Sequence, residues 1–381
     1  MSIEVLTCRV CGDTLFDKAL LTYANSPKSA QGFLDNLNDV DDSVDLEIFQ
    51  CTKCGLVQHK LSPVPYYKEV IRAVAFSEEM GNFRKVQLHD WINRNQLQDK
   101  KILEVGCGRG EYIDLLLAAG AKNVVGIEFS KENVSSARAS GHKIYQGYLD
   151  RSFSPPANFE FDAFTIFSFL EHWPNPNEGL KLLHASLSEG ACGLIEVPNF
   201  DLILEKGLYS EFTTDHIFYY DKKTFAFLLE KNGFEVTSIK PIWYDYILSA
   251  EVKRKTPLNV NNFVMIQESI GHELTRYIER FPRRTVAVWG AGHQALAVIA
   301  MAKISTAIKY ILDSAPFKQG KFTPATHLPI FNPEIILTDA PLAIIIMAAG
   351  YANEVANIIE EKYPLIKNIA ILKEDHLEIY K

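Results

Sequence analysis

A glycine-rich turn after a short apolar run constrains the fold more than any other feature of the chain. The run from Ile102 to Val105 predicts a buried strand, and glycines follow at positions 106, 108 and 110. Glycine permits positive φ and has no Cβ atom to keep a ligand away from the backbone. Apolar residues recur at helical spacing from 111 to 119, so the turn leads to a helix N-terminus. A strand, glycine turn and helix in this order predict a nucleotide-binding site in an α/β fold.

An acidic residue at the end of the next predicted strand narrows the choice of ligand. That strand stops at Glu128, where a carboxylate can accept hydrogen bonds from both hydroxyls of a ribose. The turn lacks the G-x-x-G step of the dinucleotide fingerprint, and Glu104 would repel a pyrophosphate but could orient a cationic amino-acid tail. The run EVGCGRG therefore resembles motif I of the class I S-adenosylmethionine-dependent methyltransferases, although a structural turn without a ligand is an alternative. The expected cofactor contacts are Glu104, Gly106, Gly108, Gly110 and Glu128.

Two C-x-x-C pairs stand near the N-terminus. They account for four of the six cysteines: Cys8, Cys11, Cys51 and Cys54. The N-terminal residues show no basic-then-apolar secretion signal, so we expect a cytoplasmic protein, in which disulfides are uncommon. Four thiolates paired in this way suit a tetrahedral Zn²⁺, which would be structural because sulfur fills every coordination position. A redox dithiol or a lost metal is the alternative, and Cys107 and Cys192 are predicted to be buried, inert thiols.

Length and charge limit the classes of partner. A chain of 381 residues predicts two or three domains. The formal net charge of −8 disfavours a nucleic-acid partner, because such proteins concentrate positive charge. No apolar run reaches the roughly 18 residues that span a bilayer, so we expect no membrane partner. A small-molecule substrate remains, and the sequence does not indicate an oligomeric state.

The order of predicted elements gives three domains. Strands and helices alternate from residue 101 to residue 197, which is typical of a parallel, doubly wound sheet. The segment 198–220 breaks this alternation, and we expect it to cover the site because ligands of open α/β sheets bind beyond the carboxyl ends of strands. We assign a zinc-binding module to residues 1–62 and a methyltransferase core, with this insertion, to residues 63–240.

A second strand, glycine turn and helix begin at residue 286. Gly290 follows the strand 286–289, and the next predicted strand ends at Asp313. This pattern is similar to the dinucleotide fingerprint with alanine at the third glycine, which the motif tolerates. It could mark a dehydrogenase domain, but a chain with its own upstream cofactor site needs no second one, so we favour substrate binding. Residues 241–381 are therefore predicted to form a C-terminal Rossmann-like α/β domain.

Three segments resemble one family, the sugar C-methyltransferases that act on nucleotide-linked keto-deoxysugars. They are the cysteine module with Asn25–Phe33, the core with Gly106 and Glu128, and the segment Asp313–Ile330. The resemblance covers nearly the whole chain in the same order. It implies S-adenosylmethionine as methyl donor, a structural zinc ion and a nucleotide-linked keto sugar as substrate.

The resemblance also implies a set of catalytic residues. In this family, a tyrosine, any residue, a glutamate and a histidine follow the last core strand. Here His216 and Asp215 match the histidine and the acidic residue, whereas Thr213 stands where the family has tyrosine, which leaves the tyrosine's role and the substrate open. His172 matches a second histidine of the family.

The chemistry of carbon methylation fits these assignments. A carbon next to a ketone becomes a nucleophile when a base that titrates near neutral pH removes its proton, and the enolate oxygen then needs a donor. We assign His216 as base, His172 as enolate-side donor and Asp215 as the residue that tunes or orients them, although the histidines could exchange roles. Further substrate contacts are expected from Tyr67, Glu211, Thr213, Tyr220, Gly290, His293 and Lys318.

Two other classes of function stay open at this point. An O- or N-methyltransferase for another small molecule would share the cofactor turn, but its acceptor would need no carbon acid chemistry. A zinc-containing binding protein would keep the fold without the activity. A nucleic-acid methyltransferase is disfavoured by the acidic charge balance.

Overall fold

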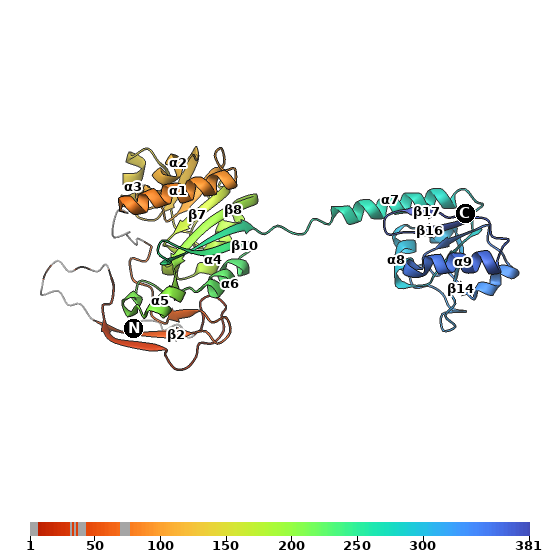
Figure 1. The fold of residues 1–381 in the computed structure, drawn as a ribbon, viewed down its shortest axis with the longest axis horizontal. Coiled ribbons are helices and arrows are strands. Elements are labelled where there is room, and N and C mark those ends of the chain that lie inside the picture. Colours follow the sequence, from red (N-terminus) through yellow and green to blue (C-terminus); the bar gives the residue numbers. More distant parts are fainter. Residues whose placement is uncertain (1–6, 31–32, 34–35, 37–42, 69–76) are drawn as a thin grey trace. The chain divides into compact units, whose positions relative to one another are not determined.

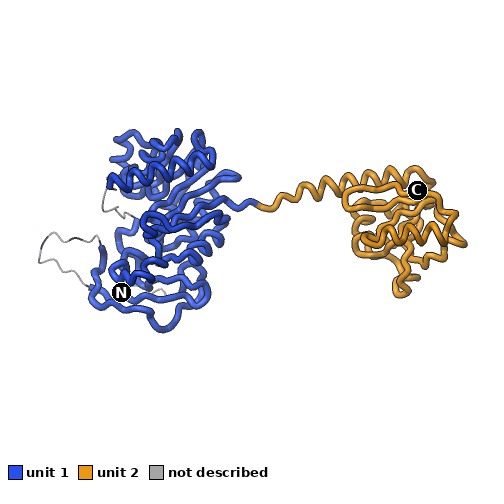
Figure 2. The backbone as a smooth tube through the Cα atoms, in the orientation of Figure 1, with its two compact units in different colours: residues 1–256 blue, residues 257–381 orange. Residues whose placement is uncertain are grey.

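The computed structural model describes residues 7–30, 33, 36, 43–68 and 77–381. The chain divides into two compact units, Met1–Thr256 and Pro257–Lys381 (Figure 2). The cysteine module and the methyltransferase core lie together in the first unit. Residues 241–256 also belong there, although the sequence assigns them to the C-terminal domain, because strand β11 (Ile247–Arg254) pairs antiparallel with β8 (Leu187–Pro198).

A seven-stranded sheet forms the centre of the first unit, in the order β10-β11-β8-β7-β4-β5-β6. The strands from β8 to β6 are mutually parallel, which confirms the predicted doubly wound sheet, whereas β10 and β11 form an antiparallel edge. Besides β8 and β11, the strands are β4 (Lys101–Val105), β5 (Asn123–Glu128), β6 (Lys143–Gln146), β7 (Phe161–Phe167) and β10 (Phe234–Ile242).

Helices cover both faces of this sheet (Figure 1). One apolar cluster joins the first face to α1 (Glu78–Arg94), α2 (Glu111–Ala118) and α3 (Lys131–Ala139). A second cluster joins the opposite face to α4 (Pro176–Ala185) and α6 (Lys222–Lys231). The carboxyl ends of the parallel strands therefore meet at one edge, where β4, β5 and β7 lead into the site.

A smaller, four-stranded sheet joins the cysteine module to the segment 198–220. Its order is β1-β2-β3-β9, with β1 (Leu21–Ser26), β2 (Val44–Gln50), β3 (Val57–His59) and β9 (Phe218–Tyr219). Strand β9 comes from the insertion, which also contains α5 (Phe200–Lys206) and the 3₁₀ helix η2 (Tyr209–Glu211). The insertion thus completes the sheet of the module.

The second unit contains its own six-stranded sheet, in the order β14-β13-β12-β15-β16-β17. Apolar side chains of α7 (Asn261–Ile278) and α8 (His293–Met301) pack on one face, and those of α9 (Ala352–Lys362) pack on the other. The strands are β12 (Val286–Trp289), β13 (Ile308–Leu312), β14 (Ile330–Phe331), β15 (Ala343–Ile346), β16 (Ile369–Leu372) and the antiparallel β17 (Leu377–Ile379). The predicted Rossmann-like domain is confirmed.

None of the helices within the described ranges combines the length and the apolar character needed to cross a bilayer.

Candidate active site

The glycine turn connects β4 to α2, and its shape requires glycine. Gly106 has φ +69° and Gly110 has φ +97°, both in the left-handed region. A Cβ atom on Gly106 would lie 2.8 Å from the ring of Phe169, and one on Gly110 would lie 2.5 Å from the ring of His142. Neither position can accept a larger residue without displacing its neighbour, so the turn holds its backbone close to the end of β7.

The carboxylate of Glu128 closes the turn from the neighbouring strand. Its two oxygens accept hydrogen bonds from the backbone N–H groups of Gly108 at 3.0 Å and Ser130 at 2.8 Å. Burial raises the pKa of Glu128, and these hydrogen bonds oppose that shift. The structure therefore brings Gly106, Gly108, Gly110 and Glu128 together, while Glu104 lies fully buried on β4.

Aromatic side chains surround this edge, and sequence reasoning missed most of them. Tyr148 makes edge contacts with Phe129 at 6.4 Å, Phe169 at 6.0 Å and Trp173 at 5.9 Å between ring centroids. Tyr67, which the sequence proposed as a substrate contact, packs against the same ring at 5.7 Å. Phe129 and Phe169 closely follow the carboxyl ends of β5 and β7, and this position in the sequence could have identified them as residues of the site.

A pair of histidines, the buried His172 and the half-buried His216, lies near the turn. The 3₁₀ helix η1 (Leu170–His172) follows directly after Phe169, the residue that contacts Gly106. Its last residue, His172, has its ring centroid 4.9 Å from that of His216. A carboxylate oxygen of Glu171 and one ring nitrogen each from His172 and His216 all lie within 4.8 Å of one another. The structure thus places both predicted catalytic histidines in one cluster.

Both histidines are neutral near pH 7. Burial lowers the pKa of His172. The pKa of His216 falls to about 3, first because of burial and then because of the neighbouring imidazoles of His172 and His59. A neutral imidazole can accept a proton, but a pKa of about 3 makes His216 a weaker base than the near-neutral base that the sequence predicts.

The hydrogen bond of His172 does not fit the predicted role of this residue as a donor to the enolate oxygen. Its Nδ1 lies 2.8 Å from the carbonyl oxygen of Asp215, so Nδ1 carries the proton and Nε2 is left with a lone pair. Neutral His172 therefore cannot donate to an enolate oxygen through Nε2. It offers an acceptor instead.

Asp215 uses its side chain elsewhere. Its carboxylate accepts hydrogen bonds from the hydroxyl of Tyr66 and the backbone N–H of Ala30, each at 2.7 Å. Its backbone carbonyl binds His172, and the charge of its carboxylate raises the pKa of His172 against the larger effect of burial. Asp215 therefore orients His172 through the main chain and affects its pKa through the side chain.

The predicted substrate contacts of the insertion have varied surroundings. The hydroxyl of Thr213 accepts the backbone N–H of His216 at 3.4 Å. Glu211 accepts a hydrogen bond from the hydroxyl of Tyr246 at 2.6 Å. Tyr220 is 1 % exposed and packs against Phe218 and Phe225 inside the apolar core, which leaves little surface for a substrate.

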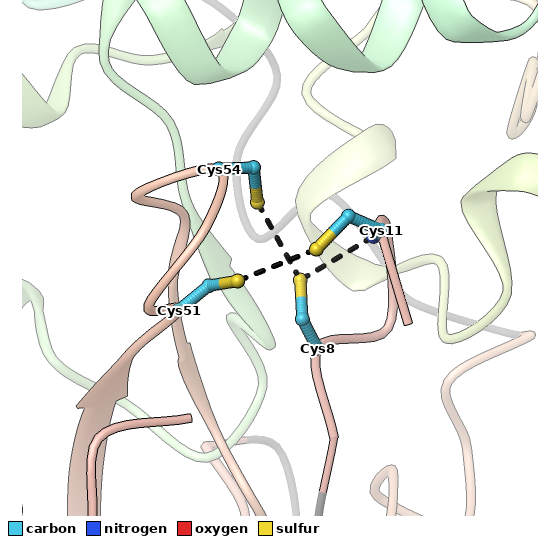
Figure 3. Close-up of side chains that lie close together, drawn as sticks. All are labelled: Cys8, Cys11, Cys51 and Cys54. Atoms are coloured by element: carbon cyan, nitrogen blue, oxygen red, sulfur yellow. Dashed lines mark hydrogen bonds between the residues drawn. The ribbon is translucent and has the colours of Figure 1, made fainter. Parts of the chain in front are cut away.

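The four cysteines of the module converge on one point (Figure 3). The sulfur atoms of Cys8 and Cys54 are 3.7 Å apart, and those of Cys11 and Cys51 are 3.3 Å apart. Each C-x-x-C pair forms the same tight turn, in which the N–H of Gly12 or Gly55 donates to the carbonyl of the first cysteine. All four ligand atoms lie within 4.8 Å of one another, so this cluster could hold a metal ion.

The glycine turn of the second unit borders a cavity of about 410 Å³. Gly290 has φ +123°, and a Cβ there would lie 2.6 Å from the carbonyl oxygen of Met347. Gly290, His293 and Lys318 all line the cavity, and Lys318 donates to the carboxylate of Asp313 at 2.9 Å. The structure brings these three predicted residues together.

Comparisons with known proteins agree with this arrangement. Residues 80–239 match a family model described as a methyltransferase domain, and residues 248–364 match one described as a C-methyltransferase C-terminal domain. The core is thus similar to a methyltransferase domain, and the region after it is similar to the C-terminal domain of C-methyltransferases. The two matches also agree with the class I methyltransferase fold predicted for the core and support S-adenosylmethionine as its cofactor.

Individual relatives are similar over different lengths. The C-methyltransferase NovU of Streptomyces niveus is 21% identical over 91% of this chain and 90% of its own length. A ubiquinone biosynthesis O-methyltransferase of Aromatoleum aromaticum is 39% identical, but over 23% of this chain and 39% of its own length. This chain therefore spans about two fifths of that O-methyltransferase. The magnesium protoporphyrin IX methyltransferase of Synechocystis shares 15% identity, with a TM-score of 0.39, over 50% of this chain and 97% of its own.

Proposed function

We propose that this protein transfers the methyl group of S-adenosylmethionine to a carbon next to the ketone of a nucleotide-linked deoxysugar. The observation that carries this proposal is that Phe169, whose ring lies against Gly106 of the cofactor turn, directly precedes the 3₁₀ helix that ends at His172, the partner of His216. A methyl donor at the turn would then lie beside two neutral imidazoles. Carbon methylation needs a base at that place, whereas a good nucleophile such as a thiol does not.

The residues support a specific course of reaction. His216 removes the proton from the carbon next to the ketone, and the electrons of that C–H bond form an enolate. The enolate carbon attacks the methyl group, the C–C bond forms, and the S–CH₃ bond breaks with its electrons moving to sulfur, which yields neutral S-adenosylhomocysteine. Until the methyl transfer, protonated His216 donates a hydrogen bond toward the enolate oxygen or toward Nε2 of His172. The transfer restores the ketone, and His216 then loses its proton to solvent.

Glu128 supports the position of the donor. In the proposed complex its carboxylate accepts hydrogen bonds from the ribose hydroxyls, as acidic residues at this strand end do in nucleotide-binding sheets. Glu104 supplies negative charge on the next strand for the cationic amino-acid tail. The positions of these two acids and of the three glycines around the turn support the proposed roles.

Zinc is the metal that the cysteine cluster fits best. Tetrahedral Zn²⁺ with Zn–S bonds of about 2.3 Å separates its sulfur ligands by about 3.8 Å, close to the observed 3.7 Å and 3.3 Å. Cys8, Cys11, Cys51 and Cys54 would hold the ion, which would stabilise the module and leave no position for a substrate.

The cavity of the second unit supports a role in substrate binding. Its glycine turn, the cation of Lys318 and the first residue of α8, His293, suit an anionic diphosphate. We therefore assign the nucleotide part of the substrate to this unit.

The decisive experiment is methyl transfer to a panel of nucleotide-linked keto sugars, combined with exchange of the carbon-bound proton in deuterated water. Wild-type protein should exchange that proton and form methylated product. His216→Asn should lose both by at least about a hundredfold, whereas His272→Gln, on the exposed surface of the second unit, should change neither. Methylation without exchange would favour an O-methyltransferase and would overturn the proposal.

A further inference from the structure

Another histidine, His59, is buried and contacts the loop that carries His216. It is the last residue of β3 and is completely buried. Its Nε2 lies 3.1 Å from the carbonyl oxygen of Thr214. His172 approaches the next carbonyl along the chain, that of Asp215, at 2.8 Å. Two imidazoles from different parts of the sequence therefore bind the two consecutive carbonyls that precede His216.

We propose that His59 is a positioning residue which, together with His172, clamps the carbonyls of residues 214 and 215 and so fixes the imidazole of His216. The clamp is a geometric feature of the chain. Its effect on catalysis rests on the proposed function, in which His216 is the reacting base.

Backbone hydrogen bonds complete the clamp on the other side of His216. The N–H of Ile217 donates to the carbonyl of Glu171 at 2.9 Å, and the N–H of His59 donates to the carbonyl of Ile217 at 3.3 Å. Strand β9 begins at the next residue and pairs with β3, with Val57 opposite Tyr219. His216 is therefore held between the end of β3 and η1, and it can move little without breaking one of these bonds.

The clamp predicts a tautomer for each imidazole. A carbonyl oxygen only accepts hydrogen bonds, so the ring nitrogen that faces it must carry the proton. His59 is then protonated on Nε2 and His172 on Nδ1, which are opposite tautomers. Burial and the charge of Arg9 lower the pKa of His59 to about 4, so the ring is neutral and carries one proton only.

A packing role alone would predict a different outcome. A histidine that only fills space could be replaced by an apolar residue of similar size without loss of turnover. A clamp residue requires a donor at the position of Nε2. Glutamine can place an amide N–H near that position, whereas methionine fills a similar volume and has no donor.

The first test is histidine-selective ¹⁵N labelling with two-bond ¹H–¹⁵N correlation spectra of the full chain near pH 7.5. Signals are assigned by their loss in His59→Gln and His172→Gln. We expect the Nε2–H tautomer for His59 and the Nδ1–H tautomer for His172. A His59 ring that is charged, protonated on Nδ1 or averaged between tautomers would overturn the clamp, and this readout needs neither substrate nor turnover.

The second test compares His59→Met with His59→Gln, with His272→Gln as a surface control. We expect His59→Met to lower kcat about 10- to 100-fold, since small displacements of a catalytic group cost about that much. KM for S-adenosylmethionine and zinc content should stay within about twofold. His59→Gln should keep kcat within about fivefold.

Equal losses in the two variants, or no loss in either, would overturn the positioning role. If the wild-type protein methylates no keto sugar, the proposed function fails, and the tautomers still decide whether the clamp exists. If His59→Met does not fold, the tautomers in the wild-type spectra still confirm or overturn the clamp.

Discussion

The two glycine turns of the molecule share their construction and differ in charge. In each, a strand leads through glycines into a helix, and the next strand ends in a carboxylate that accepts an N–H from the turn. The distances are 3.0 Å from Gly108 to Glu128 and 2.8 Å from Ala291 to Asp313. The second carboxylate also accepts a hydrogen bond from the Lys318 ammonium, whereas no Lys, Arg or His in the described ranges forms an ion pair with Glu128.

Because of this difference, the pKa values of Glu128 and Asp313 shift in opposite directions. Burial dominates at Glu128 and raises its pKa. Burial also opposes ionisation of Asp313, but the N–H groups of Ala315 and Ala291 and the ammonium of Lys318 outweigh it, so the pKa of Asp313 is lowered. Under the proposed function, the first turn keeps a carboxylate without an ion pair for the ribose hydroxyls of a cationic cofactor. The second turn would present Lys318, which is paired with Asp313, to an anionic ligand.

Removal of the metal should produce the largest difference in stability between the two units. Cys51→Ser should release the metal and lower the stability of the first unit by several kcal/mol, because metal binding supplies folding free energy in such modules. The second unit has no cysteine and should keep its own unfolding transition. Metal analysis and calorimetric melting check this, with Cys192→Ser as control. Unchanged zinc content in Cys51→Ser would show that the four-cysteine site is wrong.

Substitution of the two carboxylates tests the turns directly. Glu128→Ala should weaken binding of S-adenosylmethionine about a hundredfold, since it removes hydrogen bonds between a charged acceptor and the ribose. Asp313→Ala, the matched change in the other turn, should leave that affinity within about twofold. Isothermal calorimetry on the full chain measures both. Similar losses in the two variants would erase the distinction between the turns.

The loss of folding stability at low pH should arise in the first unit. His59 has a pKa of about 4 in the folded chain against an ordinary value of 6.5. Between these two pH values the unfolded state therefore binds a proton that the folded state does not bind. Stability is therefore lost as pH falls from about 6.5 toward 4, by about 2 kcal/mol at pH 5 for this residue. All four histidines of the second unit are exposed.

Denaturant titrations at pH 7 and pH 5 check this dependence. His59→Gln should reduce the difference in unfolding free energy between the two pH values by about 2 kcal/mol, and His272→Gln should leave it unchanged. An identical pH dependence in wild type and His59→Gln would contradict the burial of a neutral His59.

A weaker effect is expected at the second turn. With dTDP as a probe for nucleoside diphosphates, Lys318→Met should weaken binding about tenfold by removing a charge-assisted contact. Lys321→Met, which removes an exposed cation three residues away, should have little effect. Calorimetric titration of the full chain with dTDP distinguishes the two variants, and equal affinities would count against an anion site at Gly290.

The regular parts of this fold were predictable from the sequence, because glycine spacing and alternating apolar runs are local signals. Both glycine turns, the parallel strands β4 to β8 and the convergence of the four cysteines followed from such signals. The antiparallel edge β10–β11 escaped prediction because β8, which ends at Pro198, is far along the chain from β11, which begins at Ile247, and no motif marks the pairing.

The surroundings of His216 were less predictable for the same reason. Strand β9 has two residues, too few for a periodic pattern, and it forms a strand only because β3 pairs with it. His59 reaches the loop from a module far earlier in the sequence, without a motif of its own. Family resemblance located His216 and His172, but the direction of the hydrogen bond of His172 needed the three-dimensional contact with Asp215.

The position of the transferred methyl group decides between carbon methylation and its alternatives. The full chain is incubated with ¹³C-methyl S-adenosylmethionine and a nucleotide-linked keto-deoxysugar, and the product is analysed by ¹³C NMR. We expect a labelled methyl group bonded to the carbon next to the ketone, with one-bond carbon–carbon coupling when that carbon is also labelled. A labelled methyl group on oxygen or nitrogen would contradict the proposed carbon methylation.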